Sequence, residues 1–432
     1  MRGARAAVLT LPLFVVGCVT AGDAETDGAV VEAIGPWRDG EADRFADVLD
    51  PLRAATGIDV QYTGSADFVQ DLRQRVAEGA NPPDIAVIPQ LGLIEELVAD
   101  EELEPLEDGA RRLVLQSLGI DDATEDAAAG EGEDIYAVPF RLTVKSLVWY
   151  RPEVFEAHEW QIPETLDELE ALVDAISAEG EMAPWCFSIQ AGSATGWAAT
   201  DWVEDLVLRT AGADVYEQWV QGEVTFADDE IADAFTTFHD LVLARGRTVG
   251  GTRAIVETPV DEAWEPLLAD PPGCAMYKQA DFATSWMPDD LEIGPDGDVD
   301  VFIFPGTDAD ETPLVVGGDQ IVQFTRSDDV DAVMAYLAES DAAAIWARQG
   351  GFVAANPGVG DDVYPDRFRA SIGRAAERAS DVVFDASDWM PPDVGSDLLW
   401  DQITLWVSGA IDYATFAETI DEAMAEALEG RD

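Results

Sequence analysis

The chain has 432 residues, and 47% of them are hydrophobic, so it is long enough for two or more globular units with apolar cores. It carries 88 Asp and Glu against 24 Lys and Arg, which gives a formal net charge of -64. A surface of this sign repels nucleic acid and anionic lipid, which argues against both as binding partners, and the scattered acids predict a heavily hydrated surface suited to high salt.

The amino terminus has the pattern of an export signal. Two arginines precede an apolar run over residues 6–16, which is too short to span a bilayer as a helix. Gly17 then stands directly before Cys18, as in the lipobox of a bacterial lipoprotein signal. We expect cleavage before Cys18, lipid on its thiol and a polar tether over residues 19–30, with the mature protein on the extracellular or periplasmic face of the cell membrane. An ordinary secretory signal that contains a cysteine is the alternative.

Beyond Cys18 the sequence has two further cysteines, Cys186 and Cys274. In an exported chain a pair of cysteines predicts one disulfide, and two buried free thiols are the alternative. His158 and His239 are the only histidines, which leaves little support for a zinc site or a Ser-His-Asp triad. The sequence also lacks a Walker loop, a nucleophile elbow and a dinucleotide fingerprint, so no catalytic residue, metal ligand or cofactor is predicted.

The first predicted elements alternate between strand and helix. Apolar residues recur at helical spacing from Phe45 to Leu52, Gly57 ends that helix, and residues 58–62 are rich in β-forming side chains. A second helix then leads through two prolines to the short apolar strand Ile85–Ile88. Strands and helices that alternate in this way predict a parallel sheet and the α/β fold class.

Helices dominate the later part of the chain. Thr165 and Glu168 have the spacing of a capping box, and a stripe of buried residues is expected to follow them on one helix face. Two strand-like runs flank an acidic loop after Asp300. The other segments with helical periodicity are residues 93–98, 111–118, 202–211, 231–244 and most of the chain after residue 330.

The stretch PWCFSIQAGSATGWAATDW, residues 184–202, differs from the rest of this acidic chain because it carries no charge before Asp201. It holds three tryptophans among small hydroxyl and glycine residues. Neutral sugars are bound by aromatic rings that stack on their C–H faces and by polar groups that collect their hydroxyls. Trp197, in a predicted loop, is therefore the stronger ligand candidate, whereas Trp202 is expected in a helix core and Trp185 is assigned to neither.

Four motifs follow the lipobox in order: GIDVQYTG, NPPDIAVIPQ, VPFRLTVKSLVWYRPEVFE and IPETLDELEALVDAI. In this order and spacing they resemble the solute-binding lipoproteins of bacterial carbohydrate ABC importers, extracellular solute-binding protein family 1. The segments PWCFSIQAGSATGWAATDWVEDLVLR and GCAMYKQADF are similar to the branch of that family associated with alpha-glucosides. The resemblance covers essentially the whole mature chain.

The resemblance implies a two-lobed, periplasmic-binding-protein-like fold of type II, with a ligand cleft between the lobes. It implies no catalysis and no cofactor. The implied partners are an oligosaccharide, the transmembrane subunits of an ABC permease, and the membrane through lipid on Cys18, while the chain itself is expected to be a monomer. Crossings between the lobes are expected near Phe140, residues 305–312 and residues 350–352. The lobes would comprise residues 31–140 with 313–350, and residues 141–312 with 351–432.

The resemblance also implies which side chains reach the ligand. Asp84 can equally be a structural cap, and Arg141 and Lys145 can equally neutralise nearby acids. Lys145 gains weight because the chain has only one other lysine, Lys278. The implied ligand-binding residues are Trp37, Asp39, Asp84, Gln90, Arg141, Lys145, Trp197, Thr200, Asp201, Gln279, Gly318 and Asp319.

The expected function is an extracellular receptor that captures a neutral oligosaccharide, of the alpha-glucoside type such as maltose, trehalose or sucrose, and delivers it to the permease. Two alternatives stay open. One is a secreted glycoside-active enzyme that uses a pair of carboxylates. The other is a binding protein for a different solute, such as a peptide or a polyamine, although a neutral tryptophan-rich loop is a poor lining for a polyamine.

Overall fold

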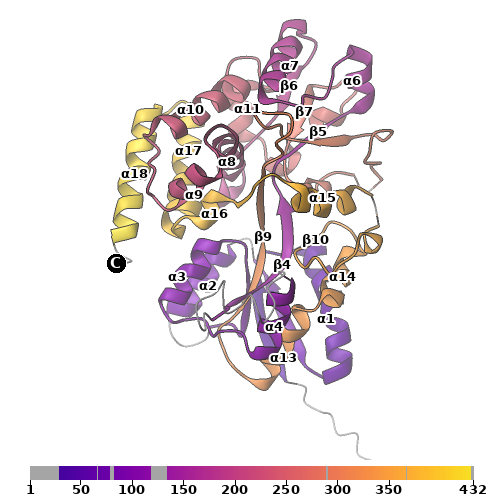
Figure 1. Cartoon of the computed structure of the whole chain (residues 1–432), viewed down its shortest axis with the longest axis vertical. Coiled ribbons are helices and arrows are strands. Elements are labelled where there is room, and N and C mark those ends of the chain that lie inside the picture. The colour runs from indigo at the N-terminus through magenta and orange to yellow at the C-terminus, as the bar shows by residue number, and fades with distance from the viewer. Residues whose placement is uncertain are drawn as a thin grey trace, which may run out of the picture.

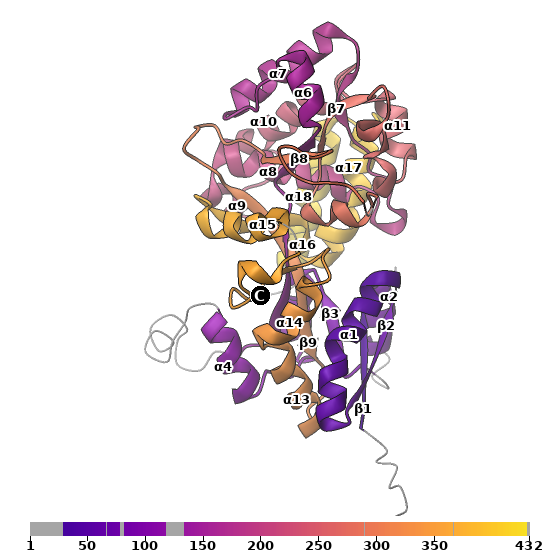
Figure 2. The ribbon, with the colours of Figure 1, turned by 90° about the vertical axis from the view of Figure 1, so that its right-hand side faces the viewer.

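The computed structural model describes residues 29–65, 67–77, 82–117, 134–288, 290–365 and 367–429. The predicted signal and the lipobox residue Cys18 lie outside these residues. The chain forms two lobes, each with its own sheet and its own covering helices (Figures 1 and 2). Among the described residues, no helix combines the length and the apolar character needed to cross a membrane.

The larger sheet forms the centre of lobe one. Its strands are β1 (Val30–Gly35), β2 (Asp59–Gly64), β3 (Ile85–Ile88), β4 (Ala137–Val144), β9 (Leu314–Gln323), β10 (Val353–Ala354) and β11 (Val382–Phe384). The order is β10-β4-β9-β3-β1-β2, with β11 paired to β9. β1 runs parallel to β2 and β3, as predicted, but β9 runs antiparallel to both β3 and β4. The sheet is therefore mixed, because the chain re-enters it from lobe two in the opposite direction.

The smaller sheet belongs to lobe two. It has the order β6-β7-β5-β8, formed by β5 (Leu147–Tyr150), β6 (Ala183–Cys186), β7 (Cys274–Lys278) and β8 (Asp300–Ile303). A disulfide joins Cys186 of β6 to Cys274 of β7, which confirms the predicted pairing. Trp185 is fully buried and meets the equally buried Trp202 edge-on, with ring centroids 4.8 Å apart. Both tryptophans belong to the core of lobe two.

Helices cover both sheets (Figure 1). Lobe one holds α1 (Asp39–Thr56), α2 (Phe68–Ala77), α3 (Leu91–Ala99), α4 (Asp108–Ser117), α13 (Asp328–Leu337) and α14 (Ser340–Ala347). Lobe two holds α6 (Pro152–His158), α7 (Leu166–Glu179), α8 (Trp197–Ala211), α9 (Ala213–Val220), α10 (Asp229–Phe238), α11 (Gly251–Glu257), α12 (Glu265–Leu268), α15 (Arg367–Arg378), α16 (Ala386–Trp389), α17 (Leu399–Val407) and α18 (Tyr413–Glu429). A π-helical turn, His239–Leu243, extends α10.

The helix signals in the sequence act as expected. Gly57 ends α1 in the left-handed conformation, with φ of 80°, and its N–H donates to the Arg53 carbonyl. At α7 the Thr165 hydroxyl accepts from the Glu168 N–H at 3.3 Å, so one half of the capping box forms. The Glu168 carboxylate accepts instead from the Glu164 N–H at 2.9 Å. The predicted α7 stripe is buried at Leu166, Leu169, Leu172, Val173 and Ile176.

The strands β4 and β9 run side by side through the junction of the two lobes (Figure 1). The chain leaves the larger sheet at Val144 and enters the smaller one at Leu147, a few residues beyond the crossing expected near Phe140. β10 still pairs with β4, so residues 353–354 remain in the larger sheet. The exact lobe boundaries stay a prediction. The pairing of β4 with β9 brings side chains of both strands to the space between the lobes.

Candidate functional site

A cavity of about 310 Å³, which we call the central cavity, lies between the two lobes. Its volume is at the lower end of the range of small-molecule binding sites. Both lobes and the joining strands β4 and β9 contribute to its wall. The predicted ligand-binding residues that line it are Trp37, Gln90, Arg141, Lys145, Trp197, Gly318 and Asp319.

Trp37 reaches the cavity from the loop between β1 and α1, but most of its ring is buried in lobe one. The side chain is 2% exposed and lies 4.9 Å from both Phe45 and Trp346, measured between ring centroids. Its Nε1 donates to Asp319 Oδ2 at 3.0 Å. The aromatic contacts fix the indole, and the indole in turn fixes the Asp319 carboxylate at the cavity wall.

Arg141 on β4 forms the cationic part of the same wall. Its Nη1 donates to Glu41 Oε1 at 2.8 Å and lies 3.7 Å from Asp319 Oδ2. Burial acts to lower the pKa of Arg141, but the carboxylates of Glu41 and Asp319 outweigh it and raise that pKa. The guanidinium is therefore charged at all working pH values and is held between two carboxylates.

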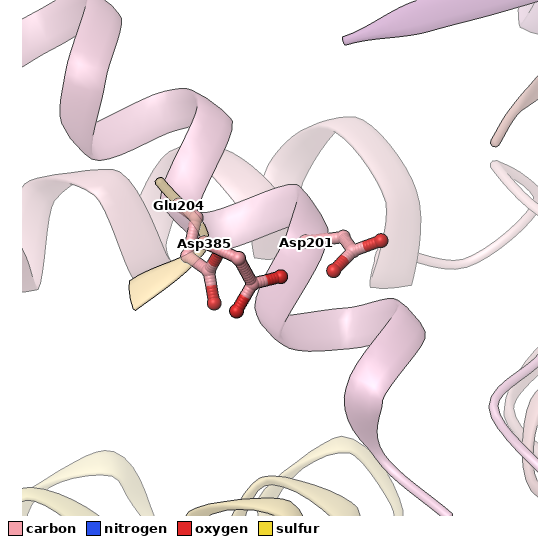
Figure 3. A group of neighbouring side chains, drawn as sticks. All are labelled: Asp201, Glu204 and Asp385. Atoms are coloured by element: carbon pink, nitrogen blue, oxygen red, sulfur yellow. The ribbon is translucent and has the colours of Figure 1, made fainter. Parts of the chain in front are cut away.

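Lys145 follows directly after β4, and a group of buried carboxylates, drawn in Figure 3, holds its ammonium group. Its Nζ donates to Asp201 Oδ1 at 3.0 Å and also bonds Asp385 Oδ2. Glu204, one turn beyond Asp201 on α8, accepts from the backbone N–H groups of Ala386 and residue 387, each at 3.1 Å. Carboxylate oxygens of the three acids lie within 4.8 Å of one another. The Lys145 ammonium, which bonds two of these acids, is the cation that they hold.

The acids around Lys145 do not all ionise alike. Burial raises the pKa of Asp201 to about 7, although Lys145 opposes the shift. Burial, with the charges of Asp385 and Asp201, raises the pKa of Glu204 well above its usual range. For Asp385, burial acts upward but Lys145 outweighs it and lowers the pKa. Asp385 is therefore the principal counter-charge of Lys145, and Glu204 takes up a proton more readily than an ordinary glutamate.

An aromatic wall faces the cavity from lobe two. Trp197 lies 5.9 Å from Phe282 and 6.5 Å from Trp286, and the latter two rings are 5.2 Å apart. Trp197 is the first residue of α8, so the predicted loop is helical from this position on. Gly196 before it has φ of 119° and touches α17, since a Cβ there would lie 2.3 Å from the Trp400 carbonyl oxygen. This close approach places Trp197 and Trp400 in the same cavity wall.

Five predicted residues lie outside the lining of the central cavity. Asp39 lines a neighbouring cavity. Asp84 accepts from the Glu32 N–H and the Thr325 hydroxyl, and so ties β1 to the end of β9. Asp201 supports Lys145 from behind. The remaining two, Thr200 and Gln279, are buried and bond Ser387 and the Ala280 N–H respectively.

Other lining residues were not predicted. They include Glu41, Thr143, Phe282, Ser285, Trp286, Ser387, Asp388 and Trp400. A signal for Phe282 and Trp286 was present in the sequence, because they follow Lys278 within the short aromatic run DFATSW. Trp400 lies 203 residues beyond Trp197, and only the packing of α17 against α8 brings the two together.

A model of the family described as bacterial extracellular solute-binding protein matches residues 42–344. The chain belongs to this family. This solute-binding protein is 33% identical over 389 residues to the osmoprotective compounds-binding protein GgtB of Synechocystis sp., a match that covers 89% of this chain and 90% of that protein. It is also 33% identical over 389 residues to the alpha-glucosides-binding periplasmic protein AglE of Rhizobium meliloti, over 88% and 84% of the two chains.

Solved structures show the same fold. A chitin oligosaccharide binding protein superposes with a TM-score of 0.75 at 20% identity, over 93% of this chain and all of the other. Maltose-bound MalE3 of T. maritima superposes with a TM-score of 0.67 at 16% identity, over 92% and 99%. At these identities the likeness shows the fold alone. The predicted family and the two-lobed type II fold are confirmed.

Proposed function

We propose that this solute-binding protein is the sugar receptor of an ABC importer and that its ligand is an alpha-glucoside. The observation that carries the proposal is the central cavity, in which an aromatic wall from lobe two faces hydrogen-bonding groups from lobe one. The naming of one relative as an alpha-glucosides-binding protein supports the choice of sugar. A glucose ring has apolar C–H faces and a polar rim of hydroxyls, which suits walls of these two kinds.

In the proposed complex, Trp197 stacks on the face of a glucose ring. Gln90 and Arg141 bond its hydroxyls, and Asp319 accepts from them. The Trp37 indole holds the Asp319 carboxylate in place. Little side-chain entropy is therefore lost when this acceptor binds the sugar. Thr200 and Asp201, together with the other residues outside the lining, act behind the wall rather than on the ligand.

Asp388 adds a donor of a different kind. It lines the central cavity, and its pKa is raised well above its usual range by burial and by the charge of Asp385. A carboxyl group with a raised pKa takes up a proton more readily, and in its protonated form it can donate that hydrogen to a sugar oxygen. We assign this role to Asp388. With this assignment, lobe one and Asp388 of lobe two both offer hydrogen-bonding groups to the sugar.

Transport follows from closure of the lobes around the sugar. The ligand contacts both lobes, so it stabilises the closed form relative to the open one, and the permease subunits read that form. The receptor is further proposed to be a monomer that stays at the cell surface through lipid on Cys18. Neither the binding of the sugar nor the closure of the lobes needs a cofactor or changes a covalent bond of the sugar.

The enzyme alternative is less well supported by the geometry. Two of the carboxylates in the cavity, Glu41 and Asp319, are both occupied by Arg141, so they do not form a free acid and base pair. The test is to incubate the purified protein with maltose, trehalose and sucrose while its melting temperature and the release of glucose are followed. The proposal predicts a higher melting temperature with at least one sugar and no glucose from it. Sustained release of glucose would establish the enzyme instead.

A further inference from the structure

A second cavity, of about 460 Å³, adjoins the central cavity beside the start of α1. Glu41, Ser285 and Trp286 belong to the walls of both cavities. The second space therefore continues the first, past the edge of the aromatic wall. A ligand longer than the part held in the central cavity would extend into it.

Basic residues gather in the wall of this second cavity, which we call the arginine cavity. Its lining arginines are Arg38, Arg44 and Arg369. They stand out in a chain with 24 basic residues against 88 acids. The acidic lining residues are Asp39 and Glu41, and the Glu41 carboxylate already accepts from Arg141 at 2.8 Å. The local charge is thus opposite in sign to that of the whole chain.

Two of these arginines converge on one turn of backbone. Arg44 Nη1 lies 3.0 Å from the position that a Cβ on Gly351 would take, and Arg369 Nη1 lies 3.7 Å from the corresponding position on Gly350. The two guanidinium groups come from different elements, α1 and α15, and meet at consecutive glycines. Like charges repel each other, so an anion bound in this cavity would stabilise the arrangement.

Two of the three arginines leave room for such an anion. Among the described residues, no ion pair with a carboxylate is seen for Arg38 or Arg44. Arg369 donates to the Thr284 hydroxyl at 2.9 Å and already interacts with the buried Asp281 carboxylate, so Arg38 and Arg44 are the side chains left for the ligand. Guanidinium groups bind carboxylates through paired, charge-assisted hydrogen bonds, which makes arginine the side chain best suited to this ligand group. The first residues of α1 line the same cavity, and no side chain caps this helix at Arg38.

We propose that the arginine cavity binds a carboxylate of the ligand, on the unit next to the glucose ring in the central cavity. The ligand class is then an alpha-glucoside of a sugar acid or hydroxy acid, with a neutral ring at one end and a negative charge at the other. This proposal rests on the sugar-receptor function proposed above. The negative net charge of the chain does not prevent carboxylate binding. At physiological ionic strength salt screens charges that lie more than about 8 Å away, so the nearby arginines dominate the electrostatic attraction.

The test compares two sugars that differ only at the end that would enter the arginine cavity. Maltobionate is maltose with its reducing end oxidised to a carboxylate. Calorimetric titration of the purified protein should show maltobionate binding at least about tenfold more tightly than maltose, which corresponds to one charge-assisted contact. Arg44→Gln should bring the ratio of the two affinities close to one. Arg112→Gln, which removes a charge from the exposed face of α4, should leave the ratio as it is.

Lactose and lactobionate serve as a second matched pair with a different sugar ring. Equal or weaker binding of the acid within a pair that binds, or an unchanged ratio in Arg44→Gln, would overturn the arginine cavity. If only the lactose pair binds, the alpha-glucoside function is wrong, and the ratio within that pair still decides the role of the arginines. If no sugar of either pair binds, the arginine cavity is overturned, and titration with trehalose and sucrose decides the alpha-glucoside function separately.

Discussion

At the scale of single residues, the two lysines of the chain show why the central cavity keeps its shape. Lys145 bonds Asp201 and Asp385, while Lys278 Nζ lies 2.7 Å from Asp205 Oδ2 and donates to the backbone carbonyl of Asp201 at 3.1 Å. Each lysine therefore ties a strand to the acidic face of α8. The rarity of lysine pointed to a special role, and that role is to hold the helix that begins with Trp197.

The contribution of Trp197 to binding can be measured by truncation. Trp197→Ala should weaken the binding of the best alpha-glucoside by at least about tenfold, because the stacking surface is lost from the aromatic wall. Trp160→Ala is the matched control, since this half-buried indole stacks on His158 beside α6, away from the cavity. Titration of both variants gives the comparison. Equal losses in the two, or no loss in Trp197→Ala, would remove Trp197 from the site.

Asp201 should make stability depend on pH. Its pKa is about 7 in the folded chain against 3.8 in the unfolded one, so between these values the folded state holds a proton that the unfolded state releases. The free energy of unfolding then falls as pH rises from about 4 to about 7, by up to about 1.4 kcal/mol per pH unit. Asp201→Asn cannot take up this proton and should give a shallower slope.

Urea unfolding at pH 5, 6 and 7 measures that slope. Asp43→Asn is the control, because this carboxylate is exposed on α1. Its slope should match that of the unaltered protein. A slope in Asp201→Asn as steep as in the unaltered protein would show that the proton resides elsewhere in the group around Lys145.

At the scale of elements, α3 of lobe one lies against α16 of lobe two (Figure 1). Trp389 Nε1 donates to Glu95 Oε1 at 3.0 Å, and Arg73 on α2 bonds Asp393 at 2.8 Å beside this contact. Gly92 makes the approach possible, because a Cβ there would lie 2.1 Å from the Met390 carbonyl oxygen. These contacts join the lobes next to the central cavity, so they stabilise the closed arrangement.

Gly92→Ala should push α3 and α16 apart. The closed form would become less populated, and the apparent affinity for sugar would fall by about tenfold or more. Gly109→Ala is the control, because a Cβ on this glycine of α4 meets only the Ala335 side chain, at 3.9 Å. Calorimetry gives the affinities and small-angle X-ray scattering gives the radius of the free protein. An unchanged affinity in Gly92→Ala would mean that this contact plays no part in closure.

The sequence was most informative about elements whose cause is local. The α7 stripe and its Thr165 cap follow from spacing alone, as does the end of α1 at Gly57. The direction of β9 could not be predicted, because it depends on how the chain returns from lobe two. The residues of the cavity wall show the same difference between local and distant causes. Trp197 could be predicted from the composition of its own segment. Trp400 could not, because it reaches the cavity only through the packing of helices that are distant in sequence.

At the scale of the whole molecule, the net charge of -64 sets the conditions under which the fold is stable. Most of the acids lie on the surface, where they repel one another. Salt screens this repulsion within a Debye length that shortens from about 10 Å at 0.1 M to about 3 Å at 1 M. The fold should therefore gain stability as ionic strength rises.

Thermal unfolding in 0.1 M and 2 M NaCl tests this. At pH 7 the melting temperature should rise by several degrees between the two solutions. At pH 4, where ordinary carboxyl groups are partly protonated, the gain should shrink because there is less charge to screen. A melting temperature that falls with salt at pH 7, or that rises equally at both pH values, would mean that surface repulsion does not limit stability.

The central claim is that the space between the lobes binds a sugar. Isothermal titration of the purified protein with maltose, trehalose and sucrose tests it most directly. The account predicts saturable one-to-one binding of at least one alpha-glucoside, weakened by Trp197→Ala and unaffected by Trp160→Ala. Absence of binding by every sugar in the panel would contradict it.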